Sequence, residues 1–248
     1  MGLVRLILAI AVALGHLGKF YFLNGMIAVQ LFFIISGFYM ALIINEKYTQ
    51  KNHIKKFYFN RLLRIFPLYL VVSLLTLIAI IWQADPLLMQ QWSILAIKTK
   101  IYILFVNLFL IGQETYLYLG INQFGELNWV KYYNNAPIKV YHFILCPQAW
   151  SLSIELAFYA IAPILVSKKI KHIWLIIIIV YLLILRIYLY RIGLYFDPWT
   201  YRFLPTELAL FITGIIGYKI YNMLKKNQLS QLDKSTFSNL FFNCHLRL

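Results

Sequence analysis

The segment LVRLILAIAVALGHLGKFYF, Leu3–Phe22, decides the fold, because it is a long apolar run with ionisable side chains in its interior. Ten residues separate Arg5 from His16. A helix turns about 100° per residue, so both residues lie on one face, about 16 Å apart along the axis. An ionisable group in hydrocarbon costs roughly 3 kcal/mol or more and therefore faces a cavity or a partner. The pattern indicates a site that receives an anion at Arg5 and performs acid–base chemistry at His16.

The composition of the whole chain places this segment in a membrane protein. Of the 248 residues, 62% are hydrophobic and 12% are charged, and the mean hydropathy is +0.74. The net charge of +15 is concentrated between apolar segments, as in cytoplasmic loops, so we expect a lipid bilayer and no nucleic acid as partner. The cysteines, Cys146 and Cys244, have neither metal nor disulfide spacing, and no metal site is expected.

Seven apolar segments predict an all-α polytopic membrane protein. Basic clusters follow the second, fifth and seventh segments, so the positive-inside rule places these loops and the N terminus in the cytoplasm. The fourth segment then cannot be a single crossing, and a re-entrant or interfacial element restores the parity. We expect an external loop after it, at residues 112–141. The segments are residues 3–22, 26–44, 65–82, 94–111, 143–166, 173–190 and 203–223.

Two motifs in the first half of the chain have both a structural and a functional interpretation. FFIISGF, residues 32–38, places Ser36 and Gly37 in the second segment, as a packing face or a substrate contact. RLLRIFPLY, residues 61–69, places Arg61 and Arg64 on one helix face, as cytoplasmic charge or as a guanidinium pair that binds phosphate. Pro67 is expected in the first turn of the next span.

A third motif, WSLSIELAFY at residues 150–159, holds Glu155, the one acid of the fifth segment. Ser151, Glu155 and Tyr159 recur every fourth residue and therefore stack on one helix face. A lone glutamate in a span is a functional candidate, and the alternative is that it neutralises Arg186 or another buried cation. Arg202 and Glu207, near the start of the last segment, either bind an external ligand or cap the helix.

The opening pair also has a structural interpretation. Arg5 alone could be an anchor that snorkels to the headgroups. His16 alone could be an interhelical hydrogen-bonding residue. An imidazole titrates near neutral pH, which favours His16 as a general base.

The order of these motifs along residues 3–223 resembles the acyltransferase 3 family, multi-spanning membrane O-acyltransferases of bacterial surface polysaccharides. The sequence departs from the family pattern at Gln30 and Leu156, where acids are common. The resemblance implies His16 and Glu155 as catalytic residues. It implies as substrate-binding residues Arg5, Ser36, Gly37, Arg61, Arg64, Trp150 and Ser153.

The resemblance implies a transferase of the bacterial inner membrane that uses no bound cofactor. It would move an acyl group, with acetyl as the expectation, from cytoplasmic acyl-CoA to a hydroxyl of an extracytoplasmic carbohydrate such as O-antigen, lipopolysaccharide or exopolysaccharide. Arg5, Arg61 and Arg64 would hold the CoA phosphates, and Glu155 would orient His16 as base, with or without an acyl-histidine intermediate. The alternatives are a transporter of a sugar or lipid-linked precursor, or an inactive remnant.

The last part of the chain carries a separate expectation. The family bundle has about ten spans, and the sequence offers seven apolar segments. We therefore expect residues 1–224 to form an incomplete membrane domain, truncated at its C terminus. Residues 225–248 would be a polar tail, natural or aberrant, with a flexible part at Asn227–Ser238.

Overall fold

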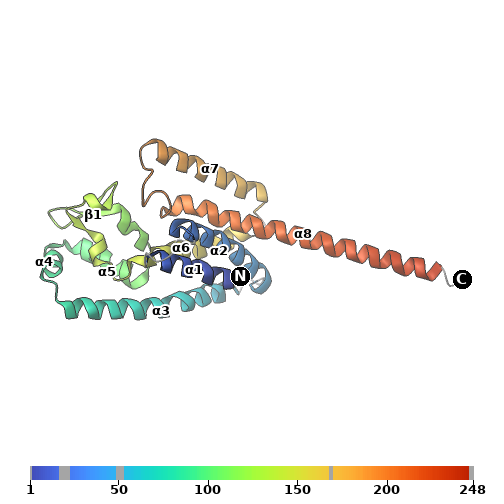
Figure 1. The fold of residues 1–248 in the computed structure, drawn as a ribbon, viewed down its shortest axis with the longest axis horizontal. Helices are drawn as coiled ribbons and strands as arrows, with labels where there is room; N and C mark the ends of the chain where they lie inside the picture. The colour runs from blue at the N-terminus through green and yellow to red at the C-terminus, as the bar shows by residue number, and fades with distance from the viewer. Residues whose placement is uncertain (1, 17–22, 49–52, 168–169, 246–248) are drawn as a thin grey trace.

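The computed structural model describes residues 2–16, 23–48, 53–167 and 170–245, and for residues 2, 16 and 227–245 it describes the backbone alone. Figure 1 shows α3 along one side of a helical bundle and α7 with α8 along the other, with α1, α2 and α6 between them. A small sheet around β1 lies at one end. The helices are α1 Gly2–His16, α2 Gly25–Lys47, α3 His53–Gln83, α4 Pro86–Ile94, α5 Ile97–Phe109, α6 Trp150–Val166, α7 His172–Arg191 and α8 Leu204–His245.

The helices confirm the predicted class, an all-α polytopic membrane protein. Four helical stretches of the described chain are long and apolar enough to cross a membrane: α2, α3, α7 and Pro147–Val166, which includes α6. The pair α4 and α5 counts as a fifth if its two helices form one span, and it is bent by 120°. This bend fits the re-entrant or interfacial element that the sequence predicts at residues 94–111. α1 is a shorter apolar helix.

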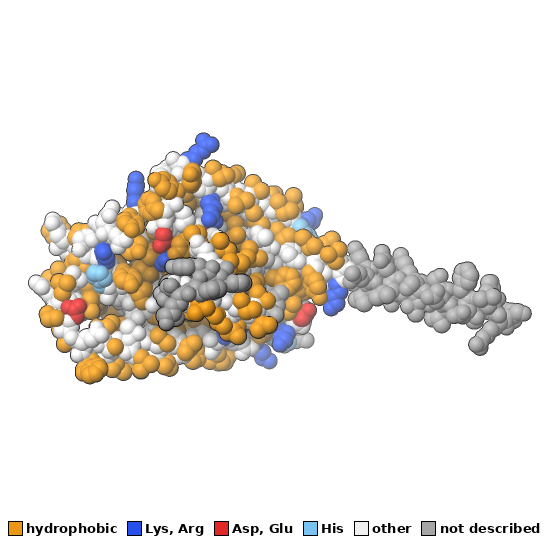
Figure 2. All heavy atoms as spheres, in the orientation of Figure 1, with side chains coloured by type: hydrophobic (Ala, Val, Ile, Leu, Met, Phe, Trp, Pro, Cys, Tyr) orange, Lys and Arg blue, Asp and Glu red, His pale blue; other side chains and the backbone are white. Residues whose placement is uncertain are grey.

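The surface of the bundle suits hydrocarbon rather than water. In the most apolar stretches of α3 and α7, 17% of the residues are buried inside the protein, and the rest lie at its surface. Large apolar side chains such as Leu68, Leu75 and Tyr181 are exposed. Figure 2 shows apolar side chains over much of the visible face, with charged groups scattered singly or in small clusters. Contiguous exposed apolar surface of this extent is typical of contact with lipid.

Two sequence predictions about element boundaries are wrong. α3 begins at His53, well before the expected start at Ile65, so Pro67 lies inside the helix and not in its first turn. Residues 112–141 are not a plain loop, because they hold 3₁₀ turns and an antiparallel sheet of order β2–β1–β3, formed by Leu119–Ile121, Leu127–Trp129 and Ile138–Lys139. The backbone of Asn227–Ser238 continues α8 as a helix, and the flexibility of this segment stays a prediction.

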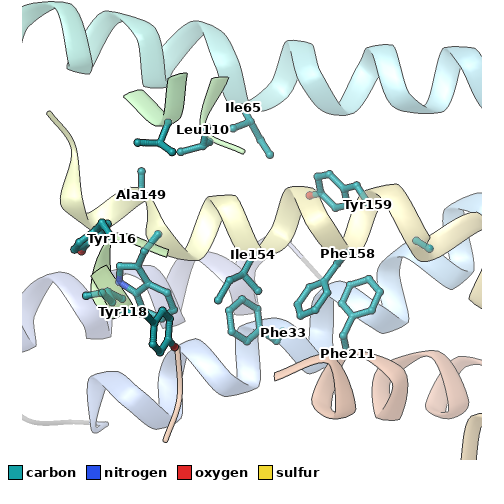
Figure 3. Close-up of a cluster of buried hydrophobic side chains, with 14 of the residues drawn as sticks. Phe33, Ile65, Leu110, Tyr116, Tyr118, Ala149, Ile154, Phe158, Tyr159 and Phe211 are labelled. Atoms are coloured by element: carbon teal, nitrogen blue, oxygen red, sulfur yellow. The ribbon is translucent and has the colours of Figure 1, made fainter. Parts of the chain in front are cut away.

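α2 is the central helix, and it packs against α1, α6 and most extensively α8. A methyl group on Gly37 would overlap the backbone carbonyl of Phe211 in α8, and one on Gly214 would overlap that of Ile34. The two glycines therefore let the helix backbones approach closely. Phe158 stacks on Phe211 with ring centroids 4.3 Å apart, beside Phe33 and Ile154 (Figure 3). This core fixes the positions of α2 and α6, which carry the polar residues described next.

Candidate active site

Arg5 lies in a buried polar cluster made by three helices. Its Nη2 atom donates to Ser36 Oγ of α2 and lies 2.9 Å from Glu155 Oε1 of α6. The same carboxylate oxygen accepts from Ser36 Oγ at 3.1 Å and from the Tyr159 hydroxyl at 2.6 Å. Arg5, Ser36, Glu155 and Tyr159 are all buried. The structure therefore brings together the charged residue of the first segment and the acid of the fifth, 150 residues apart.

Glu155 neutralises Arg5, not Arg186. Arg186 instead lies 3.7 Å from Glu207, which also accepts from Gln30 at 3.5 Å. Along α1, residue 16 lies about 16 Å from Arg5. His16 is the last residue of α1, and its side chain lies outside the described part of the structure. The ion pair with Arg5 fits the alternative that Glu155 neutralises a buried cation, and its role towards His16 stays a prediction.

Arg61 is the second buried guanidinium, and it lies among aromatic rings. Its Cζ atom is 5.6 Å from the ring centroids of Phe57 and Tyr159 and 5.8 Å from that of Tyr39. Tyr39 also lies 5.7 Å from the Cζ atom of Arg5. Within the described residues no carboxylate pairs with Arg61, and its buried Nε atom has no hydrogen-bond partner. Cation–π contacts stabilise such a group only partly, so an anion would find an unneutralised charge here.

Arg64 does not share the environment of Arg61. It is exposed on α3, whereas Arg61 is 93% buried, with 7% relative exposure. Residues three apart on a helix differ by about 60° in direction, which is enough to turn one inward and the other outward. Arg64 can therefore attract a ligand at the surface, but in this structure it does not form a clamp with Arg61.

Gly37 and Ser153 serve packing and loop attachment. Gly37 lies against the Phe211 backbone, as described above, so the packing interpretation of the FFIISGF motif holds for this residue. Ser153 accepts from the backbone N–H of Gln113 at 3.0 Å and donates to Glu114 Oε2 at 2.5 Å. These bonds attach the segment after α5 to α6. Glu114 is a buried acid that the sequence did not single out, and burial raises its pKa above the ordinary value of 4.5.

Trp150 lines a cavity at the N-terminal end of α6, away from Arg5, which we call the outer cavity. The cavity has a volume of about 780 Å³ and lies between α1, the start of α2 and the segments around residues 116–151 and 201–202. The guanidinium of Arg202 lies 4.8 Å from the Trp150 ring and 4.9 Å from the Tyr201 ring. Its Nε atom is 3.0 Å from Asp197 Oδ1. Burial raises the pKa of Asp197, although the neighbouring Arg202 opposes the rise.

The face of α1 connects the two regions. Ala9, Val12 and Ala13 line the outer cavity, and they follow Arg5 by four, seven and eight residues, which is the spacing of one helix face. On its other side the Arg5 cluster adjoins a crevice of about 360 Å³ between α3 and α6, lined by Arg61 and Tyr159 among others. The Arg5 cluster and a larger polar cavity thus share one helix.

Two residues of the cluster were missed as site residues by sequence reasoning. Tyr159 follows Glu155 by four residues on the same helix face, and this spacing could have predicted the hydrogen bond between the two side chains. Tyr39 follows Ser36 by three residues, but nothing in the sequence shows that its ring lies between two arginines. In the described ranges no group of three or more His, Cys, Asp or Glu residues could hold a metal ion.

Comparison with known proteins places these observations in a family. The acyltransferase 3 family model, described as an acyltransferase domain, matches residues 1–237. The protein named "Putative O-acetyltransferase SACOL0978" of Staphylococcus aureus strain COL is 26% identical over 216 residues, which are 86% of this chain and 30% of that protein. "O-acetyltransferase OatA" of Staphylococcus aureus strain NCTC 8325 is 29% identical over 168 residues, 66% of this chain and 24% of that protein.

The matches cover most of this chain but a small part of each relative. The chain spans about 30% of the length of the first curated relative and less of the second. No solved structure matches the chain. The family model covers most of the sequence, including every motif of the Arg5 cluster and of the outer cavity. The chain therefore belongs to the acyltransferase 3 family of multi-pass membrane proteins.

Proposed function

We propose that the protein is a membrane O-acyltransferase that moves an acetyl group from cytoplasmic acetyl-CoA to a hydroxyl of an extracytoplasmic carbohydrate in the bacterial inner membrane. Its N terminus is cytoplasmic in this proposal. The names of the relatives support acetyl transfer to oxygen. The donor, the acceptor and the orientation are proposed from the arrangement of charge and cavities.

The observation that carries the proposal is the surplus of positive charge in the Arg5 cluster. Two buried guanidiniums, Arg5 and Arg61, lie on either side of the Tyr39 ring. Glu155 pairs with Arg5, and no carboxylate of the described chain pairs with Arg61. An unpaired buried charge is costly, so the site favours an anion that supplies the missing charge. Guanidinium binds phosphate well, and coenzyme A carries phosphates next to a flexible arm that ends in the thioester.

The reaction follows from this placement. With the CoA phosphates at Arg5, Arg61 and the surface residue Arg64, the thioester arm extends along the α1 face for about 16 Å to His16. His16 removes the proton of an acceptor hydroxyl, whose oxygen bonds to the acyl carbon as the carbon–sulfur bond breaks. The CoA thiolate leaves and takes up a proton. Glu155 holds Arg5 in position through the ion pair, and Ser36 and Tyr159 hold Glu155.

Arg61→Lys tests the donor site. The chain is purified in detergent and supplied with radiolabelled acetyl-CoA, and we expect the KM for acetyl-CoA to rise about tenfold or more, because lysine keeps the charge but loses the bidentate geometry. Lys56→Gln is the matched control, since Lys56 is exposed on the same helix. Unchanged KM and unchanged acetyl-CoA binding in Arg61→Lys would remove the donor site from this cluster. Movement of a labelled saccharide across a vesicle membrane without acetylation would instead indicate a transporter.

His16→Ala tests the base. We expect acetyl transfer to disappear while expression and acetyl-CoA binding stay at the level of the unmodified protein, because the donor is held at the other end of the α1 face. Retained transfer would exclude His16 from proton removal. Gly15→Ala, next to it on α1, is the control, because a methyl group there meets no atom of the described residues within 4 Å.

A further inference from the structure

The charged side chains that line the outer cavity are basic. Its lining includes Lys139, His142 and Arg202, and no Asp or Glu side chain is among the described residues that line it. Asp197 is not among the residues that line the cavity, but it forms an ion pair with Arg202, which does line it. The lining therefore carries a net positive charge even after Asp197 is counted. In a cavity with low-dielectric walls, such a lining concentrates negatively charged ligands.

Arg202 is fixed with hydrogen-bonding capacity to spare. Its guanidinium is held between the rings of Trp150 and Tyr201, and its Nη2 atom donates to the Tyr201 hydroxyl at 2.5 Å. The contact between Arg202 Nε and Asp197 Oδ1 has the distance of an ion pair, yet both buried atoms lack a hydrogen bond of good geometry. A rigid guanidinium with unused donors is suited to a planar or tetrahedral anion.

The remaining walls suit a sugar. Tyr116, Tyr133, Tyr141, Trp150 and Tyr201 supply rings, and Asn134 and Gln148 supply amides. Pockets that bind small molecules combine apolar and aromatic walls with a few convergent polar groups, and they commonly measure about 300–1,000 Å³. A cavity of about 780 Å³ is large enough for a short oligosaccharide.

We propose that this cavity binds the acceptor and selects a saccharide that carries an acidic group, a carboxylate or a phosphate, next to the hydroxyl to be acetylated. The proposal rests on the proposed function and adds the charge class of the acceptor. The acidic group pairs with Arg202 and Lys139, and the sugar ring packs on Trp150 and Tyr201. The acceptor hydroxyl then lies on the side of the cavity formed by α1, where Val12 and Ala13 precede His16 by about one helical turn.

The expected preference follows from the cost of leaving Arg202 without its anion. A hydrogen bond to a charged group changes affinity by on the order of tenfold to a hundredfold. A site built around such a group rejects a ligand that lacks it, because the polar atoms then stay unpaired. An acidic acceptor should therefore bind at least tenfold more tightly than its neutral counterpart.

Binding of three matched oligosaccharides to the purified chain tests the proposal. The probes are a hexuronic acid oligosaccharide, the same compound after reduction of its carboxylates to alcohols, and a phosphorylated neutral oligosaccharide of equal length. The variants are Lys139→Gln and Arg202→Lys. Lys131→Gln is the control, because Lys131 is exposed on the neighbouring segment and does not line the cavity.

The expected result is tighter binding of at least one acidic probe than of the reduced one, with the difference much reduced in Lys139→Gln and Arg202→Lys and unchanged in Lys131→Gln. Whichever acidic probe binds more tightly identifies carboxylate or phosphate as the recognised group. Equal affinity for all three probes overturns the proposal, as does an equal loss in the control. Acetyl transfer is measured separately: selective binding without transfer contradicts the proposed function, and efficient transfer to the reduced probe contradicts the acidic acceptor.

Discussion

Arg5 Nη2 and Glu155 Oε1 lie 2.9 Å apart, and the two side chains are 10% and 5% exposed. The pair joins the first helix of the chain to α6. Ser36 and Tyr159 complete the coordination of the same carboxylate oxygen. Buried pairs of this kind contribute little net stability as a unit, yet removal of one partner leaves the other charge uncompensated.

Glu155→Gln should destabilise the protein by roughly 3 kcal/mol, because it keeps the shape of the side chain and removes its charge. The double variant Arg5→Met/Glu155→Gln should be less destabilised than the sum of its single variants. Denaturant unfolding in detergent measures the three free energies. Additivity within about 0.5 kcal/mol would show that the two residues do not interact energetically. The double variant should not transfer acetyl groups, since Arg5 is needed for the donor in the proposed function.

Gly37→Ala and Gly214→Ala should each destabilise the contact between α2 and α8 by about 1–3 kcal/mol or more, because the added methyl group overlaps backbone atoms of the facing helix. Gly217→Ala is the matched control on α8, since the nearest atom to its methyl group would be a Phe38 ring carbon at 3.7 Å. Thermal unfolding and the fraction of monodisperse protein in detergent provide the measurement. Equal behaviour of Gly214→Ala and Gly217→Ala would show that the close helix crossing is not required.

Gln30→Glu should lower the stability at neutral pH by about 1 kcal/mol or more, because it places a second carboxylate next to the fully buried Glu207. For a protein of this size such a change lowers Tm by roughly 2–4 °C. The loss should shrink as the pH falls, because protonation of either acid removes the repulsion. The exchange variant Gln30→Glu/Glu207→Gln should restore most of the stability, and a double variant no better than the single one would contradict the contact.

Glu114→Gln should change how stability depends on pH. Burial raises the pKa of Glu114 from its ordinary value of 4.5, so the folded state binds the proton more tightly than the unfolded state. For such an acid, stability is highest below the unfolded pKa and is lost as the pH rises towards the folded pKa. Glutamine keeps the acceptor for Ser153 and cannot ionise. Its unfolding free energy should therefore fall less above pH 4.5 than that of the unmodified protein, and parallel pH profiles would show that Glu114 does not contribute.

The sequence predicted most of the helices because hydropathy is a local property. α2, α7 and the bend between α4 and α5 lie close to the expected segments. The start of α3 was missed because its first two turns are basic and resemble a loop, although they are helical. The three-stranded sheet was missed because its short strands pair across turns, and such pairing depends on tertiary context more than on local propensity.

The candidate site could be predicted only in part. Spacing on a helix shows which residues share a face, and it identified Arg5 and Glu155 as candidates on their own helices. It cannot show which helices meet, so it could not identify Arg5 as the buried cation that pairs with Glu155. The same limitation applies to Arg61 and Arg64, whose burial depends on which direction of α3 faces α6.

The close crossing of Gly37 and Gly214 has a consequence for biosynthesis. The two residues are far apart in the chain, so α2 enters the membrane long before α8 is translated. During that interval the small-residue face of α2 has no partner, and Ser36 on the same helix has its own polar group to satisfy in lipid. The final geometry around Arg5 is therefore set by a late event, the arrival of residues 204–218 beside α2. Release of the nascent chain before that point would leave a membrane-inserted intermediate in which α2 lacks its α8 partner.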